Sequence, residues 1–181
     1  FDLGTASTAP GGLGGLYSIC WAHDPASLED YRVKLGSFTM SGVETVTVQT
    51  CTLGVPCDVE ITGYNLAATN RIVITDLADT CGQEHLNLRH FTGLSNPAAV
   101  AGDPADFPKA EERFSLGVPT GGVPGDYAIC WGHDPADAGD YHVRVATLRV
   151  GGPDAAPTVC TLSEPCQIAL SGVRLAHTSR V

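Results

Sequence analysis

The segment YSICWAHDPASLEDY, from Tyr17 to Tyr31, recurs as YAICWGHDPADAGDY, from Tyr127 to Tyr141, at a distance of 110 residues. Both copies carry a cysteine followed by a tryptophan, then a His-Asp-Pro tripeptide, between two tyrosines. A match of this length does not arise by chance, and self-similarity at a fixed period is typical of repeat architectures. The sequence therefore predicts a tandem-repeat protein.

Further segments repeat at nearly the same distance. CTLGVPC at 51–57 recurs as CTLSEPC at 160–166, and ITGYNLAATNRI at 61–72 recurs as LSGVRLAHTSRV at 170–181. The period of about 110 residues is the size of one immunoglobulin-like sandwich. Only residues 73–113 occur once, so the 181 residues hold less than two periods.

The first repeated segment alternates large apolar residues with small ones. The large residues are Tyr17, Ile19 and Trp21 in the first copy and Tyr127, Ile129 and Trp131 in the second. An alternation with a period of two predicts a β-strand. The next strand changes phase near Gly36 in one copy and near Ala146 in the other, which predicts a β-bulge at the same place in both.

Composition also favours strands over helices. Hydrophobic residues make up 43% of the chain, and 21 glycines and 12 prolines suit many short strands joined by turns. We expect an all-β fold of tandem immunoglobulin-like β-sandwich repeats, each of about 110 residues.

Charge excludes two classes of partner. The net charge is −10, and Lys34 and Lys109 are the only lysines. A protein that binds nucleic acids or anionic membrane surfaces needs a stripe of basic residues, and this chain lacks one. No apolar run approaches the roughly 18–20 residues that a membrane span requires, so we expect no membrane insertion.

Seven cysteines indicate an oxidising compartment. Cys51 and Cys57 form one close pair, and Cys160 and Cys166 form another, each with five intervening residues. That spacing is wider than the two to four residues of zinc sites, and no histidine pair lies nearby at ligand spacing. We therefore expect disulfides, no metal, and an extracellular or cell-surface location.

The motifs also resemble known repeats. GDYAICW followed by YHVRVATLRV resembles the last two strands of an immunoglobulin-like sandwich, and CDVEITGYNL resembles the second strand of transcription-factor-type (IPT/TIG) and filamin-like repeats. Together with C-x-L-x-x-P-C, they are similar to repeats of protist and algal surface proteins, with mastigoneme filament proteins and extracellular glycofibrils as the nearest group. The resemblance covers most of the chain apart from about residues 83–113, and it implies a structural role outside the cell.

Our preferred division places a complete immunoglobulin-like repeat at 43–152. The C-terminal half of one repeat then precedes it at 1–42, and the N-terminal half of the next follows at 153–181. Gly-Gly-Pro at 151–153 makes a natural junction. Both end segments are then incomplete repeats, and we expect their open sheet edges to pair with strands of other chains.

A second division, into domains at 1–84 and 114–181, changes the cysteine pairing. Under the preferred division Cys81 pairs with Cys130, and Cys20 stays unpaired or forms an intermolecular bond. Under the second, Cys20 pairs with Cys81, and Cys130 is left alone. An odd cysteine in a secreted protein indicates an intermolecular bond or missing sequence.

The most enzyme-like feature is the His-Asp-Pro tripeptide at 23–25 and 133–135. Adjacent residues on a strand point to opposite sides, so His and Asp cannot form a relay there, and Asp-Pro typically starts a turn. G-x-S-x-G, P-loop and H-E-x-x-H motifs are absent from the sequence. We expect neither catalytic residues nor a cofactor.

Aromatic and acidic residues are the other binding candidates. Trp21 and Trp131 could stack on sugars, but they share a strand face with Tyr17 and Tyr127, which favours a core or assembly role. Four acidic residues could bind calcium, but no D-x-D-x-D-G loop is present, which favours a solvated surface; they are Asp76, Asp79, Asp103 and Asp106. No N-x-S/T sequon occurs, while Ser, Thr and Pro in loops leave O-linked glycans open.

Three functions are compatible with these features. The leading hypothesis is a structural subunit of an extracellular filament, carrying glycans and binding copies of itself head to tail through strand complementation. The alternative is a ligand-binding ectodomain of a cell-surface adhesin or receptor. The third is an accessory domain of a secreted enzyme.

Overall fold

The computed structural model describes residues 2, 4, 6, 13–44, 47–177 and 179. Across these residues, helix is limited to three short 3-10 turns, η1 (Leu28–Asp30), η2 (Pro104–Asp106) and η3 (Ala138–Asp140). The remaining regular structure is β-strand, so the expected all-β fold is confirmed.

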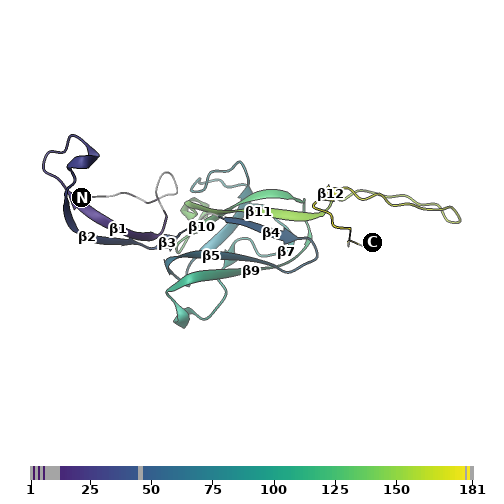
Figure 1. The fold of residues 1–181 in the computed structure, drawn as a ribbon. Helices are drawn as coiled ribbons and strands as arrows, with labels where there is room; N and C mark the ends of the chain where they lie inside the picture. Colours follow the sequence, from purple (N-terminus) through teal and green to yellow (C-terminus); the bar gives the residue numbers. More distant parts are fainter. Residues whose placement is uncertain are drawn as a thin grey trace.

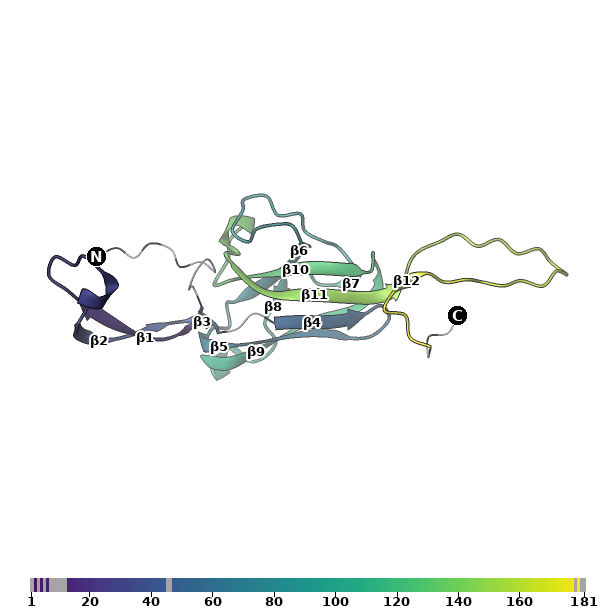
Figure 2. The same ribbon diagram turned by 45° about the horizontal axis from the view of Figure 1, so that its top comes forward.

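The strands follow in chain order as β1 (Gly15–Trp21), β2 (Val33–Met40), β3 (Gly42–Val43), β4 (Thr47–Thr52), β5 (Cys57–Leu66), β6 (Arg71–Asp76), β7 (Thr92–Leu94), β8 (Ala98–Ala99), β9 (Lys109–Gly121), β10 (Gly125–Gly132), β11 (Val143–Pro153) and β12 (Gly172–Val173). Figures 1 and 2 show three parts in a row. The β1–β2 hairpin projects from one end of a central two-sheet body, and a long extended loop projects from the other.

The central body consists of two sheets around one core. One sheet has the order β12-β11-β10-β6-β8, with β4 pairing in parallel with β11, and the other has the order β3-β5-β9-β7. Inward-facing residues of both sheets form a single cluster, whose largest fully buried members include Ile72, Ile74, Phe114, Leu116, Ile129 and Leu148. The alternation of β5, with Cys57, Val59 and Ile61 buried, follows from packing on this core.

Strand β10 is buried on both of its faces. Tyr127, Ile129 and Trp131 belong to the main core, while Cys130 on the opposite face joins a second cluster with Val73 and Tyr141. The segment after β6 covers that second face through three partly buried residues, Cys81, Leu86 and Leu88. Because of this cover, the small residues on one face of β10 are as deeply buried as the aromatic residues on the other face.

The two repeated hairpins have the same register. Tyr17 lies opposite Phe38 in β1–β2, and Tyr127 lies opposite Leu148 in β10–β11. In each hairpin the register shifts between the isoleucine and the cysteine, at Ile19/Cys20 and Ile129/Cys130. These shifts lie directly across from the places where the phase change predicted a β-bulge.

The junctions on either side of the sandwich also repeat. In β3–β5, Gly42 lies opposite Tyr64 and Val43 opposite Gly63. The same arrangement recurs in β11–β12, where Gly152 lies opposite Val173 and Pro153 opposite Gly172. A Cβ atom on Gly63 would lie 2.2 Å from the Gly42 carbonyl oxygen, and one on Gly172 would lie 2.3 Å from that of Gly152. Only glycine allows this close backbone approach.

Three disulfides connect six of the seven cysteines. Cys51–Cys57 joins β4 to β5 inside the core, Cys81–Cys130 fastens the covering segment to β10, and Cys160–Cys166 lies in the exposed C-terminal loop. Cys20 is free and exposed. The structure therefore contains the pairing of the preferred division, and the Cys20–Cys81 pairing is not formed. The division itself at 1–42, 43–152 and 153–181 stays a prediction.

Candidate interaction surface

The two copies of the aromatic strand lie in different environments. Tyr127 and Trp131 are only 8% and 7% exposed in the sandwich, whereas Tyr17 and Trp21 are 41% and 44% exposed in β1. Ile19 is exposed where Ile129 is fully buried. Since the two hairpins have nearly the same sequence and the same register, the difference comes from what covers them.

Strand β2 shows the same contrast as β1. Val33 and Leu35 are exposed, while their counterparts Val143 and Val145 belong to the core. We call the corresponding surface of β1–β2 the hairpin face; it consists of Tyr17, Ile19, Trp21, Val33, Leu35 and Phe38. The counterparts of these six side chains lie in one buried cluster. Exposed apolar surfaces of this kind mark interaction sites on proteins.

The sandwich itself indicates which elements the hairpin face lacks. There, β6 pairs with β10, β4 pairs with β11, and β5 and β9 pack across the core. In the part of the chain that the structure describes, β1 and β2 pair only with each other. As far as the described residues go, both outer edges of this hairpin and its apolar face are therefore open.

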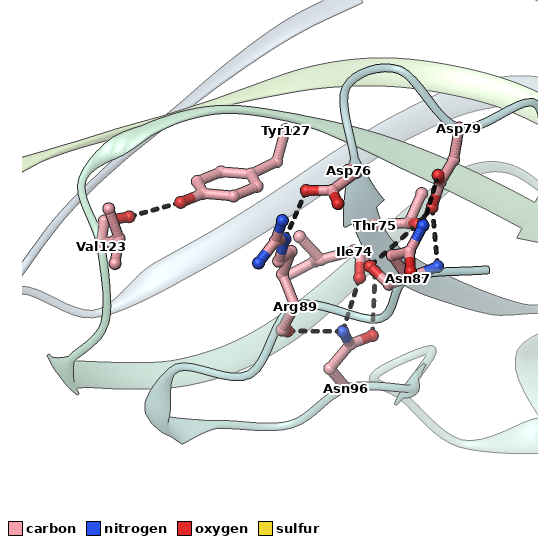
Figure 3. Close-up of polar contacts among 9 residues, drawn as sticks. All are labelled: Ile74, Thr75, Asp76, Asp79, Asn87, Arg89, Asn96, Val123 and Tyr127. Carbon is pink, nitrogen blue, oxygen red and sulfur yellow. Dashed lines mark hydrogen bonds and ion pairs between the residues drawn. The ribbon is translucent and has the colours of Figure 1, made fainter.

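The hairpin face is nevertheless locally ordered. The Tyr17 hydroxyl donates to the Leu13 carbonyl oxygen at 2.7 Å, as the Tyr127 hydroxyl donates to that of Val123 at 2.5 Å (Figure 3). Burial raises the pKa of Tyr127 above its ordinary value. The tyrosine contact thus forms in both environments, and it holds the ring in place without a covering sheet.

A second uncovered element lies at the opposite end of the molecule. Residues 154–175, which we call the arm, extend from β11, and they are exposed along nearly their whole length (Figures 1 and 2). Ile168 and Leu170 are 47% and 44% exposed, whereas their counterparts in β5, Val59 and Ile61, are buried. The arm therefore exposes two apolar residues whose counterparts in β5 lie in the core.

The His-Asp-Pro tripeptides form turns. Asp24 and Asp134 adopt positive φ angles of 50° and 47°, and η1 and η3 follow them. Asp30 and Asp140 accept backbone hydrogen bonds in the two turns, which lower the pKa of both carboxyl groups. These contacts explain the tripeptide as a repeated turn at the tip of each hairpin.

The acidic residues considered for calcium bind protein groups instead. Asp76 pairs with Arg89, and Asp79 accepts hydrogen bonds from Thr75 and Asn87 (Figure 3). Burial opposes ionisation of Asp79, but these hydrogen bonds outweigh it and lower its pKa. Asp103 caps η2, and Asp106 lies 3.4 Å from the Lys109 amine. Among the described residues, no cluster of three or more potential metal ligands is present.

Sequence reasoning missed one buried polar group. Glu112 lies in β9 with its side chain in the sandwich, where Asn70 Nδ2 donates to Glu112 Oε1 at 2.5 Å. Asn70 Oδ1 in turn lies 2.9 Å from His133 Nδ1. Burial raises the pKa of Glu112 to about 7, while Asn70 and the Trp131 indole act in the opposite direction. Within the described part of the chain, neither Glu112 Oε2 nor Trp131 Nε1 has a hydrogen-bond partner of ordinary geometry.

A cavity of about 500 Å³ lies beside this group, where the hairpin meets the sandwich. Ser41, Asn65, Trp131 and His133 contribute to its lining. No helix in the described residues is long and apolar enough to cross a membrane. Comparisons of the chain with protein-family models, with curated proteins and with solved structures found no match.

Proposed function

We propose that this chain is a structural subunit of an extracellular filament, built from tandem immunoglobulin-like sandwiches that associate head to tail with copies of the same chain. The observation that carries the proposal is the hairpin face, which is uncovered in β1–β2 while the same surface is buried in β10–β11. A filament contact would supply the missing cover.

The energetics favour a partner. Burying a large apolar side chain contributes roughly 1.5–3 kcal/mol, and the hairpin face has six. An isolated two-stranded hairpin is marginally stable in water, and its open edges can pair with further strands. When another sheet element covers the N-terminal hairpin, its apolar side chains become buried and its open strand edges form backbone hydrogen bonds.

The positions of the two uncovered elements favour a fibre over a closed ring. The β1–β2 hairpin and the arm lie at opposite ends of the sandwich (Figures 1 and 2). Contact between unlike surfaces is heterologous, and it continues without limit unless the rotation between subunits closes a ring. A linear polymer is the simplest outcome.

An extracellular location is consistent with the three disulfides, which persist in oxidising compartments. The filament would carry any glycans as O-linked sugars on loop serines and threonines, since the sequence has no N-linked acceptor site. A net charge of −10 keeps the unassembled chain soluble and away from nucleic acids.

The direct test is the association state of the purified chain. Sedimentation velocity over a concentration series, with negative-stain electron microscopy, should show concentration-dependent oligomers that extend in one direction. Ile19→Asp should weaken association at least tenfold, because it places a charge on the hairpin face. Leu28→Asp is the matched control, since Leu28 is exposed on the same hairpin but lies in η1, outside that face. A chain that stays monomeric at every concentration contradicts the proposal.

The cavity at the hairpin–sandwich junction supports a second candidate, a ligand-binding ectodomain of an adhesin or receptor. An aromatic wall with a few polar groups is typical of small-ligand sites, and here Trp131 lies beside Asn65 and His133. A glycan array separates the two candidates: saturable binding that is lost in Asn65→Ala favours the receptor, and no binding favours the filament.

A further inference from the structure

We propose that the hairpin face is covered by the arm of a second copy, whose residues 156–161 pair in parallel with β2. This inference rests on the proposed head-to-tail assembly and names the two segments that meet in it. The hairpin and the arm of one molecule lie at opposite ends of its sandwich, so the arm that covers a given hairpin belongs to another molecule (Figures 1 and 2).

The sandwich supplies the geometry of the contact. Strand β4 pairs in parallel with β11, from Ala146 opposite Thr47 to Gly151 opposite Thr52. The counterpart of β11 is β2, 110 residues earlier, and the counterpart of β4 is the arm segment 156–161, 109 residues later. The register that follows places Phe38 opposite Thr158, Thr39 opposite Val159, and Met40 opposite Cys160.

Each element carries what the other lacks. The hairpin lacks counterparts of β4 and β5, and the arm contains both in sequence, joined by the Cys160–Cys166 disulfide as β4 and β5 are by Cys51–Cys57. The arm lacks a sheet on which Ile168 and Leu170 can pack. The hairpin face presents the counterparts of the β10 and β11 residues that share a core with Val59 and Ile61, the residues equivalent to Ile168 and Leu170. The contact would bury both sets of apolar side chains.

The repeated junction directs the arm to this place. The pairing of β11 with β12 reproduces that of β3 with β5, residue for residue. The arm therefore leaves the sandwich as β4 and the first part of β5 leave the preceding hairpin. Stacking copies by this relation continues the same geometry along one axis, which is what an open fibre requires.

Disulfide trapping tests the register. In a Cys20→Ser background, which removes the only free cysteine, Thr39→Cys is introduced in one protein and Val159→Cys in another. Both positions are exposed, so neither change disturbs a core. After mixing and mild oxidation, the disulfide-linked mixed dimer should form at least tenfold faster than the linked homodimer of either protein alone. Mass spectrometry should identify the peptide pair that contains both introduced cysteines.

Thr39→Cys mixed with Thr161→Cys is the matched control, because two residues along a strand displace the partner by roughly 7 Å. Preferential trapping at Val159 supports the inference. A chain that forms oligomers in sedimentation but is trapped equally at both arm positions, or at neither, overturns the arm as the partner. The filament proposal then still holds. Monomers that show no trapping overturn both. Peptide mapping of the unmixed proteins should recover the three native disulfides, which excludes disulfide scrambling as a cause.

Discussion

Trp21 and Trp131 occupy equivalent positions in two hairpins of the same register, opposite Val33 and Val143, yet only Trp131 lies within a core. The chain thus contains a buried site and its uncovered duplicate. A comparison of the two isolates the effect of burial, because the local sequence and the strand geometry are held nearly constant.

Replacing each tryptophan with alanine should affect stability very differently. Trp131→Ala should lower the free energy of unfolding by about 3–5 kcal/mol, the usual cost of removing a large aromatic from a core. Trp21→Ala should lower it by less than about 1 kcal/mol in dilute solution, where the hairpin is uncovered, but should weaken association. Urea unfolding followed by far-UV circular dichroism measures the first effect, and sedimentation measures the second. Equal stability losses would mean that Trp21 is covered within the monomer.

The disulfides should also differ in their contributions. Cys81–Cys130 closes a loop with a sequence separation of 49, and its removal by Cys81→Ala/Cys130→Ala should cost about 4 kcal/mol through loop entropy alone. Cys160→Ala/Cys166→Ala is the matched control in the exposed arm, and it should leave the thermal midpoint of the sandwich within about 1 °C. Differential scanning calorimetry of both variants measures the difference. A large loss in the arm variant would show that the arm packs on its own sandwich.

The stability of the sandwich should depend on pH through Glu112. Its pKa is about 7 in the folded state, above the ordinary value of 4.5, so the folded chain holds a proton that the unfolded chain releases. The resulting stabilisation is fully present below pH 4.5 and is lost as the pH rises through 7. Its size is on the order of 3 kcal/mol. Asn70 and His133 belong to the same hydrogen-bonded group as Glu112. The ion pairs Asp58–Arg113 and Asp76–Arg89 lie outside that group.

Glu112→Gln isolates this contribution. Glutamine keeps the shape of the protonated side chain and cannot ionise, so the variant should lose the decline in thermal midpoint between pH 4.5 and 7. Glu60→Gln, an exposed change on the neighbouring strand β5, should retain it. A decline of the same size in Glu112→Gln would assign the pH dependence to other groups.

Strand content, hairpin and β-bulge could be predicted from the sequence because they depend on local alternation. Tyr17, Ile19 and Trp21 share one face of a strand whatever covers it. The exposure of that face could not be predicted, because nearly identical segments differ only in their tertiary neighbours. Pairing of Cys81 with Cys130 instead of Cys20 likewise depends on which hairpin the segment after β6 covers, and sequence spacing does not determine that.

Glu112 was missed for a related reason. The run Glu111-Glu112-Arg113 has the composition of a solvated surface, and nothing in it distinguishes the middle residue. Only the alternation of β9, in which Phe114 and Leu116 also point inward, indicates that Glu112 shares their face. A charged residue in phase with core residues is therefore the signal that could have identified it.

Replacing the glycine at each junction should have a different effect: Gly63 should affect the stability of the sandwich, and Gly172 should affect the position of the arm. Gly63→Ala should cost at least about 2 kcal/mol or distort the β3–β5 pairing, because the added methyl group would overlap the Gly42 carbonyl oxygen. Gly172→Ala should leave the sandwich stable and displace the arm, since the same overlap arises with Gly152 at the β11–β12 pairing. Gly36→Ala has open space around the added carbon and is the neutral control for the unfolding measurement. Urea unfolding measures the first effect, and the in-register trapping rate between Thr39→Cys and Val159→Cys measures the second. An unchanged trapping rate in Gly172→Ala would mean that this junction does not direct the arm.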